Sequence, residues 1–286
     1  MDVDKYYNID VSKTISFLKN ETVFKNGFTY NKKTKNRIRA IIPVHMYGNA
    51  VDLGELINLC SSMNIKVVED ASESLGTFLK RDKDDPSHTG TFGEIGCLSF
   101  NGNKMITTGG GGMILTNDNQ LAEKAKYLTT QAKDDPVRYI HNDIGYNFRL
   151  TNIQAAVGLA QIQQLDYFLS RKKYIYEFYK KFCSRTEGLE MASCPTYSIN
   201  NNWMSILQID EDIYGKDRED VMMHLSNKKI QTRPVWALIH QQKPYINAQR
   251  YKISLAYELV EKSLCLPSST DIKKTDLEKI INELGN

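Results

Sequence analysis

The chain has 286 residues, of which 41% are hydrophobic and 25% are charged, and its formal net charge at pH 7 is +3. Such a composition is typical of a globular protein with room for one large α/β domain and a smaller one. No apolar run approaches the roughly 18 to 20 residues needed to cross a bilayer. The near balance of charges gives no sign of a basic face, so we expect neither a membrane nor a nucleic acid partner.

The cysteines and histidines show no spacing typical of a metal site. Five cysteines are widely separated without a CxxC pair, and five histidines are equally scattered. This pattern favours reduced thiols over disulfides or zinc, and we expect no metal. The residues after Met1 do not form a basic segment followed by an apolar one, which predicts no signal peptide and a cytoplasmic location.

Short apolar runs alternate with helical stretches from residue 38 onward. We expect strands over 38–44, 65–70, 95–100 and 111–117, and a helix over 51–63. Continuous Val, Ile and Leu runs separated by helices indicate a parallel sheet that is covered on both faces. Ligands of such sheets bind beyond the carboxyl ends of the strands.

The middle of the chain contains a polar segment and a long helical pattern. The polar segment 81–90 is predicted to be a surface loop. Thr151 and Gln154 form a capping box, and the apolar spacing that follows predicts one long amphipathic helix bridging two domains. We place the boundary near the end of this helix, with a large domain over 1–183 and a small domain over 184–286.

Shorter units follow in the C-terminal part. The pattern predicts a strand over 204–209, a helix over 217–229 and a last helix over 275–284. Thr275 and Glu278 have the spacing of a second capping box. Strands and helices in this order are typical of a small α+β domain.

Two residues at the exits of expected strands, Asp70 and Lys104, are the strongest functional signal. An amine and a carboxylate in these places are the two anchors that pyridoxal phosphate (PLP) chemistry requires. The lysine would hold the cofactor aldehyde as a Schiff base, and the aspartate would keep the pyridine nitrogen protonated. Each has a plainer interpretation by itself, Asp70 as a helix cap and Lys104 as a solvated lysine, so the hypothesis depends on the pair.

Further polar residues near these strand ends suit a phosphate group. Ser99 leaves the same strand as Lys104, although it would serve equally as a turn serine. Asn147 and Arg149 precede the capped helix, and arginine can bind phosphate with two hydrogen bonds, although a surface ion pair is as consistent. The glycine run 109–112 lacks the order of a phosphate loop. His45 is predicted to pack against a strand end rather than face a ligand.

The segment 231–245 concentrates cationic and aromatic side chains with little helical periodicity. Arg233, Trp236, His240 and Lys243 lie within it. Such a mixture suits a nucleotide diphosphate or a sugar, and Arg233 and His240 are therefore our candidates for binding the substrate.

Several long segments resemble one known family over almost the whole chain. PVHMYGNAVDL, VVEDASESLG, GTFGEIGCLSFNGNKMITTGGGGM and GYNFRLTNIQAAVGLAQIQQLD resemble the DegT-type sugar aminotransferases, which are PLP enzymes of the aspartate aminotransferase fold. QAKDDP, KKIQTRPVWALIHQQKPY and LCLPSS most resemble the LegC-type branch, which aminates UDP-linked 4-keto-6-deoxy-N-acetylhexosamines. The implied fold class is α/β of the PLP-transferase type, with a mainly parallel sheet, helices on both faces and a smaller α+β C-terminal domain.

The resemblance implies roles for individual residues. It makes Lys104 the Schiff-base lysine, Asp70 the pyridinium partner and Ser99 a phosphate ligand. Asn147 and Arg149 match residues that reach across a homodimer interface to the cofactor phosphate of the partner.

One residue, Glu73, and the opening segment of the chain depart from the family pattern. Glu73 matches the position that contacts the ring hydroxyl of the cofactor, where many relatives have His or Gln. The opening MDVDKYYNID resembles the segment after the third strand of the family's large domain. We therefore expect the N-terminal portion of that domain to have no counterpart here.

The reaction implied is ping-pong transamination, in which glutamate donates an amino group and the 4-keto sugar accepts it. One alternative is a truncated, catalytically impaired chain that acts at most as a partner subunit. A sugar dehydratase of the same fold is a second alternative, but that chemistry replaces the lysine with histidine. A dinucleotide-binding protein is the weakest alternative, because the glycine run does not follow a first strand.

Overall fold

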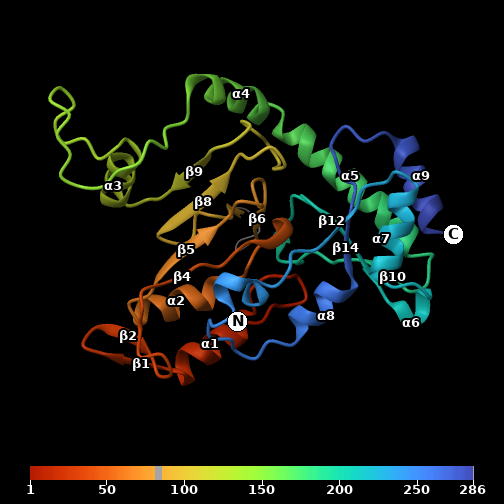
Figure 1. The fold of residues 1–286 in the computed structure, drawn as a ribbon, viewed down its shortest axis with the longest axis horizontal. Helices are drawn as coiled ribbons and strands as arrows, with labels where there is room; N and C mark the ends of the chain where they lie inside the picture. Colours follow the sequence, from red (N-terminus) through yellow and green to blue (C-terminus); the bar gives the residue numbers. More distant parts are fainter. Residues whose placement is uncertain (81–85, 286) are drawn as a thin grey trace.

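The computed structural model of the chain describes residues 1–80 and 86–285, and its central element is a four-stranded sheet (Figure 1). The strand order is β4-β5-β8-β9. β5 is parallel to β4 and to β8, whereas β9 is antiparallel to β8. The bounds are β4 Ala40–Ile41, β5 Lys66–Asp70, β8 Ile95–Ser99 and β9 Gly112–Leu115. The mainly parallel sheet is therefore confirmed.

The expectation of a parallel fourth strand is wrong for a topological reason. A parallel neighbour needs a crossover connection of a dozen or more residues, usually a helix. The loop 100–111 between β8 and β9 contains no helix or strand, so the chain returns antiparallel. β9 forms an edge of the sheet, with Met113 50% and Ile114 47% exposed.

The expected strand over 38–44 is divided between two sheets. β3 (Arg37–Ile38) pairs with the hairpin of β1 (Thr22–Lys25) and β2 (Phe28–Asn31), whereas β4 joins the central sheet. α1 (Val11–Asn20) and α2 (Gly54–Ser62) pack beside this hairpin. Their buried side chains form one core cluster, which includes Ile15, Leu18, Leu56, Cys60 and Val67.

The prediction of a surface loop over 81–90 is wrong for residues 87–89, which the structure describes. Residues 81–85 lie outside the described part of the chain, but β7 (Ser87–His88) pairs with β6 (Phe78–Leu79), which also pairs with β11 (Ser198–Ile199). Thr89 is fully buried, and its hydroxyl donates a hydrogen bond to the hydroxyl of Ser74. Polarity alone did not reveal this small sheet.

The capping box at Thr151 and Gln154 is confirmed, but the single long helix is not. α4 (Asn152–Ile162) ends before α5 (Leu165–Cys183) begins. The break gives the two helices different environments. α4 has no buried residue, whereas the second half of α5 packs into the C-terminal core.

The C-terminal part is an antiparallel sheet of order β10-β12-β14-β13 with helices on it. α5 contacts β10 and β12, α9 contacts α5 and α7, and α8 contacts β12. A boundary near residue 183 remains a prediction, because α5 contributes to this core. The bounds are β10 Leu189–Met191, β12 Ser205–Ile209, β13 Arg233–Pro234, β14 Ser263–Leu266, α6 Glu211–Tyr214, α7 Arg218–Asn227, α8 Leu255–Lys262 and α9 Lys274–Leu284.

The capping box expected at Thr275 and Glu278 is wrong, because α9 begins one residue before Thr275. The carboxylate of Asp276 instead accepts the backbone N–H of Lys273 at 3.2 Å. α3 (Asn119–Thr129) lies beyond β9 and likewise has no buried residue. No helix among the described residues is long and apolar enough to cross a membrane.

The first residues of the chain are bound to α8. The Asp2 carboxylate accepts the backbone N–H groups of Leu255 and Ala256 at 3.2 and 3.0 Å and the Ser254 hydroxyl at 3.1 Å. Burial alone would raise the pKa of Asp2, but these bonds and Lys13 hold it well below its usual range. Asp2 therefore caps the N-terminus of α8, where negative charge is favourable.

Gly48 is expected to be intolerant of a side chain. Its φ is +87°, and an added Cβ would lie 1.8 Å from Oδ1 of the buried Asn201. Left-handed strain and overpacking together predict that Gly48→Ala lowers the free energy of unfolding by about 2–4 kcal/mol. Denaturant unfolding measures this, with Gly27→Ala as control, because Gly27 also has positive φ but no atom within 4 Å of the added Cβ. Equal losses in the two variants would contradict the packing argument.

Candidate active site

The Lys104 side chain lies in a cavity between the two halves of the chain. Its Nζ is 3.7 Å from Oε1 of Glu73 and 4.5 Å from the ring centroid of Trp203. The side chain is only 14% exposed. The cavity has a volume of about 440 Å³, and its described lining includes Lys104, Lys172, Arg233 and Trp236 but no carboxylate. This composition favours an anionic ligand.

Glu73 is held in place by the backbone of Tyr47, which is itself bonded to Trp236. Its Oε2 accepts the backbone N–H of Tyr47 at 2.7 Å, and the Tyr47 hydroxyl accepts the backbone N–H of Trp236 at 3.0 Å. Tyr47 has a φ of +55°, an uncommon conformation for a residue with a side chain. Burial raises the pKa of Glu73, an effect that the bond from Tyr47 and the charge of Lys104 oppose. The arrangement places a fixed carboxylate 3.7 Å from the Lys104 amine.

Asp70 ends β5 and lies near Glu73, since its charge contributes to the raised pKa of that residue. Its Oδ1 accepts the backbone N–H of Ser72 at 3.0 Å. No helix begins at Ala71, so the plainer interpretation as a helix cap does not apply. Asp70 and Lys104 are thus both neighbours of Glu73.

The preceding residue, Glu69, forms a fully buried pair with His45. Oε2 of Glu69 lies 2.9 Å from Nε2 of His45 and accepts the backbone N–H of Gly90, while Oε1 accepts those of Phe92 and Gly93. Nδ1 of His45 accepts the Val51 N–H, which assigns the ring proton to Nε2. His45 packs at the strand end as expected. The pair fixes the ends of β4 and β5 beneath Asp70.

The other predicted phosphate ligands do not all meet at Lys104. Ser99 ends β8, and its hydroxyl is 3.4 Å from the backbone nitrogen of Asn101. Asn147 and Arg149 are exposed and bonded to each other at 3.3 Å. Arg149 lines a different cavity of about 850 Å³ beside β9 and α3. Within this chain Asn147 and Arg149 are therefore separate from the lysine cavity.

Arg233 and His240, the predicted substrate ligands, are also separated. Arg233 lies on β13 and lines the lysine cavity. His240 bonds through Nε2 to the Tyr257 hydroxyl at 2.8 Å and is not among the residues that line it. The structure thus places only one of the two beside Lys104.

Sequence reasoning missed two residues of the cavity wall, Trp203 and Lys172. Lys172 has a detectable signal: it precedes Ile175, Tyr176 and Tyr179 at helical spacing, on the face of α5 that becomes buried. A lysine in such a stripe is unusual. Trp203 precedes the strand β12 and has no comparable signal.

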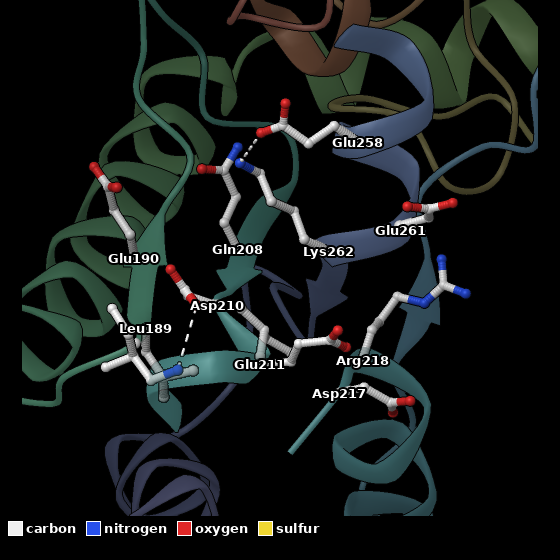
Figure 2. A pocket seen from close by; sticks show the side chains of 13 residues that line it. Leu189, Glu190, Gln208, Asp210, Glu211, Asp217, Arg218, Glu258, Glu261 and Lys262 are labelled. Carbon is white, nitrogen blue, oxygen red and sulfur yellow. Dashed lines mark hydrogen bonds and ion pairs between the residues drawn. The ribbon is translucent and has the colours of Figure 1, made fainter. Parts of the chain in front are cut away.

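A second cavity of about 540 Å³ lies in the C-terminal part, between β10, β12, α7 and α8 (Figure 2). Several of its carboxylates already have structural partners. Asp210 and Asp217 cap α6 and α7, and Glu258 pairs with Lys262 at 2.8 Å. The two cations in its described lining, Arg218 and Lys262, are paired with Glu219 and Glu258, so this cavity is not our candidate site.

The sequence is similar to proteins of one family. The profile of the DegT/DnrJ/EryC1/StrS aminotransferase family matches residues 1–285. The chain is 34% identical to the "Putative pyridoxal phosphate-dependent aminotransferase EpsN" of Bacillus subtilis (strain 168), over 92% of this chain and 67% of the relative. It is 38% identical to the GDP-perosamine synthase of Escherichia coli O157:H7, over 87% of this chain and 65% of the relative.

Solved structures show the same fold. A DegT DnrJ EryC1 StrS aminotransferase from Brucella abortus matches with a TM-score of 0.83 and 22% identity, over 99% of this chain and 71% of the other. DesI, solved in the presence of its TDP-sugar product, matches with a TM-score of 0.84 and 22% identity, over 99% and 67%. The PLP-transferase fold class is therefore confirmed.

The match bears on the expected extent of the chain. It begins at residue 1, so it gives no support to the expectation that an N-terminal portion of the family domain is missing. The chain spans about two thirds of the length of the curated relatives that it matches, with values of 67%, 65% and 66%. The LegC-type branch is not shown, since these relatives include GDP-perosamine synthases.

Proposed function

Since the chain belongs to the DegT/DnrJ/EryC1/StrS aminotransferase family, we propose that it transfers an amino group to the keto carbon of a nucleotide-linked sugar with the help of PLP. One observation carries the proposal. Lys104 lies in a cavity beside the carboxylate of Glu73, and the charged side chains in the described wall of this cavity are cationic.

The residues around Lys104 fit PLP. The cavity of about 440 Å³ lies within the usual range for small-molecule sites, and its Lys104 amine can bond to an aldehyde. Asp70 and Glu73 supply carboxylates near the same place. Lys104 would hold the cofactor aldehyde, Asp70 the ring nitrogen, Glu73 the ring hydroxyl and Ser99 the phosphate. PLP, when bound, supplies a ring that accepts electrons while nitrogen moves between carbonyl compounds.

The protein's own residues would then bind the substrate and move protons. The Lys104 amine, when free, would take up and release the proton that moves during the transfer. Glu73 Oε1, at 3.7 Å, is placed to exchange a proton with that amine. Arg233 in the cavity wall would bind an anionic part of the substrate.

For the substrate we propose glutamate as amino donor and a UDP-linked 4-keto-6-deoxy-N-acetylhexosamine as acceptor, the pair implied by the LegC-type resemblance. Similarity to GDP-perosamine synthase and the TDP-sugar bound to DesI make GDP- and TDP-linked 4-keto-6-deoxy sugars the competing acceptors. The cavity accounts for an anion but does not favour one base over another.

An acceptor panel tests the function. Purified protein is incubated with PLP, and transfer from glutamate is followed with UDP-, GDP- and TDP-linked 4-keto-6-deoxy sugars, with product detected by mass spectrometry. We expect amination of at least one sugar and fastest turnover of the UDP-linked one. Faster turnover of another nucleotide would refute the UDP assignment alone. Absence of both PLP attachment and transfer would refute the proposal and favour a chain that acts only as a partner subunit.

Asp70→Asn should weaken catalysis without preventing attachment of PLP. An amide cannot stabilise a protonated ring nitrogen as a carboxylate does, so we expect transfer to fall roughly 10²- to 10³-fold. Turnover of glutamate measures the effect, and Asp52→Asn is the matched control on the loop before α2. An unchanged rate would exclude the proposed role of Asp70.

We further propose that two copies form the active unit, with Asn147 and Arg149 serving the phosphate site of the partner. Supporting this, both residues are exposed and separate from the lysine cavity of their own chain. Large apolar side chains are exposed nearby and would be covered in such a dimer. They include Val137 at 80%, Phe148 at 72%, Ile153 at 80% and Leu159 at 61%.

A further inference from the structure

The indole of Trp203 contacts both the backbone and the side chain of the lysine loop. Its Nε1 donates to the backbone oxygen of Asn103 at 2.8 Å, and its ring lies 4.5 Å from Nζ of Lys104. Trp203 is 1% exposed and belongs to a core cluster with Met105, the residue that follows Lys104 in the sequence. The position of Lys104 therefore depends on where this indole is held.

The backbone of Trp203 is itself anchored on both sides. Its N–H donates to Oδ1 of Asn201 at 2.9 Å, and its carbonyl oxygen accepts Nζ of Lys172 at 2.8 Å. Asn201 also donates to the backbone oxygens of Glu73 and Leu75 at 2.9 and 3.0 Å. The same short segment thus connects the lysine loop with the loop that carries Glu73.

Lys172 is an unusual choice for this place. It is 8% exposed, and its Nζ donates to the Trp203 oxygen, to the Ser268 oxygen at 2.5 Å and weakly to the Ser268 hydroxyl at 3.4 Å. Burial lowers its pKa to about 8, and no carboxylate among the described residues forms an ion pair with it. Burial of an unpaired cation is costly, so packing alone would favour an apolar side chain on this face of α5.

The neighbouring Arg171 supplies a comparison within the same helix. Its Nε and one terminal nitrogen donate to the backbone oxygens of Thr270 and Ile272 at 3.0 and 2.7 Å. Each cation therefore donates to two backbone carbonyl groups, but both partners of Arg171 lie after β14, whereas those of Lys172 are Ser268 after β14 and Trp203 before β12. Only Lys172 is bonded to Trp203.

We propose that Trp203, anchored by Lys172, is a positioning residue that holds the Lys104 amine toward the cavity and Glu73. The proposal rests on the function proposed above, in which Lys104 bonds to PLP. A displacement of about 1 Å at a reacting group can cost roughly 10²-fold in rate, so loosening of this wall is sufficient to impair the lysine.

The first test uses the protein without PLP. The chain has two tryptophans, so Trp236→Phe leaves Trp203 as the fluorescent reporter. In this background we expect Lys172→Met to raise acrylamide quenching of Trp203 at least about twofold, because the indole loses an anchor. Arg171→Met, the matched control, should leave quenching unchanged while losing a similar number of hydrogen bonds. Equal quenching in the two variants would overturn the proposal.

The second test measures attachment of PLP to Lys104, trapped by borohydride and located by peptide mass spectrometry. We expect attachment to be about tenfold slower in Lys172→Met and in Trp203→Phe, which keeps an aromatic ring but loses the donor to Asn103. The double variant should be no slower than the worse single variant, as expected for residues that act as one unit. Lys172→Arg should restore at least half of the wild-type rate, since arginine can also donate to two carbonyls.

The outcomes separate this inference from the proposed function. Wild-type attachment with unchanged attachment in Lys172→Met and Trp203→Phe would overturn the positioning role and leave the function intact. Additive losses would overturn the coupling between the two residues. No attachment in the wild-type chain would overturn both. If Lys172→Met does not fold, Trp203→Phe and Lys172→Arg decide the question.

Discussion

Replacing Lys104 with alanine is expected to abolish covalent attachment of PLP and to lower amino transfer by roughly 10²- to 10⁴-fold or more. In the proposed function this amine bonds to the aldehyde, and the other described cations of its cavity are Lys172 and Arg233. Lys172 uses its hydrogens on carbonyl groups, and arginine does not serve as an amine nucleophile. Borohydride trapping and the glutamate-dependent transfer assay measure the two effects.

Two controls make the Lys104 result specific. Lys104→Arg keeps a positive charge near Glu73 and Trp203 but should also fail to attach PLP, which separates bonding from electrostatics. Lys124→Ala removes an exposed lysine that pairs with Asp143, and should leave attachment unchanged. PLP attached to another lysine in the Lys104→Ala chain would contradict the assignment of Lys104 as the attachment site.

Glu69→Gln is expected to give the largest loss of stability, roughly 3–5 kcal/mol in the free energy of unfolding. The carboxylate accepts four hydrogen bonds, three of them from backbone N–H groups, at a fully buried position. In glutamine an NH₂ group replaces one of the two carboxylate oxygens, so the N–H groups that bonded to this oxygen lose their acceptor. Buried donors without an acceptor are costly.

Denaturant unfolding measures this loss, with Glu94→Gln as the matched control. Glu94 accepts one backbone N–H, from Val67, and its partly exposed carboxylate pairs with Lys66. We expect about 1 kcal/mol there. A loss below about 1 kcal/mol for Glu69→Gln would show that the buried pair with His45 does not stabilise the fold.

Glu69 should also make the stability of the fold sensitive to acid. Burial alone would raise the pKa of Glu69, but hydrogen bonds from His45, Gly93 and Gly90 outweigh burial and hold it below its usual range. A carboxyl with a depressed pKa stabilises the fold above its unfolded pKa of about 4.3, and this contribution is lost as pH falls through the folded value. The free energy of unfolding should therefore fall less on acidification in Glu69→Gln than in the wild-type chain.

The strands that end near the site could be predicted because short apolar runs between helical stretches mark them. The runs 65–70 and 95–100 are short and rich in apolar residues, and β5 and β8 occupy them almost residue for residue. The helices over 217–229 and 275–284 follow apolar spacing in the same way, and α7 and α9 confirm them. Local pattern was sufficient wherever burial repeats with the period of the element.

Contacts between distant segments could not be predicted from local pattern. Trp203 lies 99 residues after Lys104 along the chain, and only the fold brings its indole to the lysine loop. The break between α4 and α5 is equally hidden, because the apolar spacing continues through it while the surroundings change. His240 shared a segment with Arg233, but its bond to Tyr257 keeps it away from the cavity.

The cap that Asp2 provides for α8 has a consequence for synthesis of the protein. The acceptor is made some 250 residues before its donors, Leu255 and Ala256. At roughly 5–20 residues per second on a ribosome, this carboxylate waits on the order of ten seconds or more for its partners. The segment around Asp2 therefore reaches its native environment only after α8 has been made, and chaperones would have most to protect during that interval.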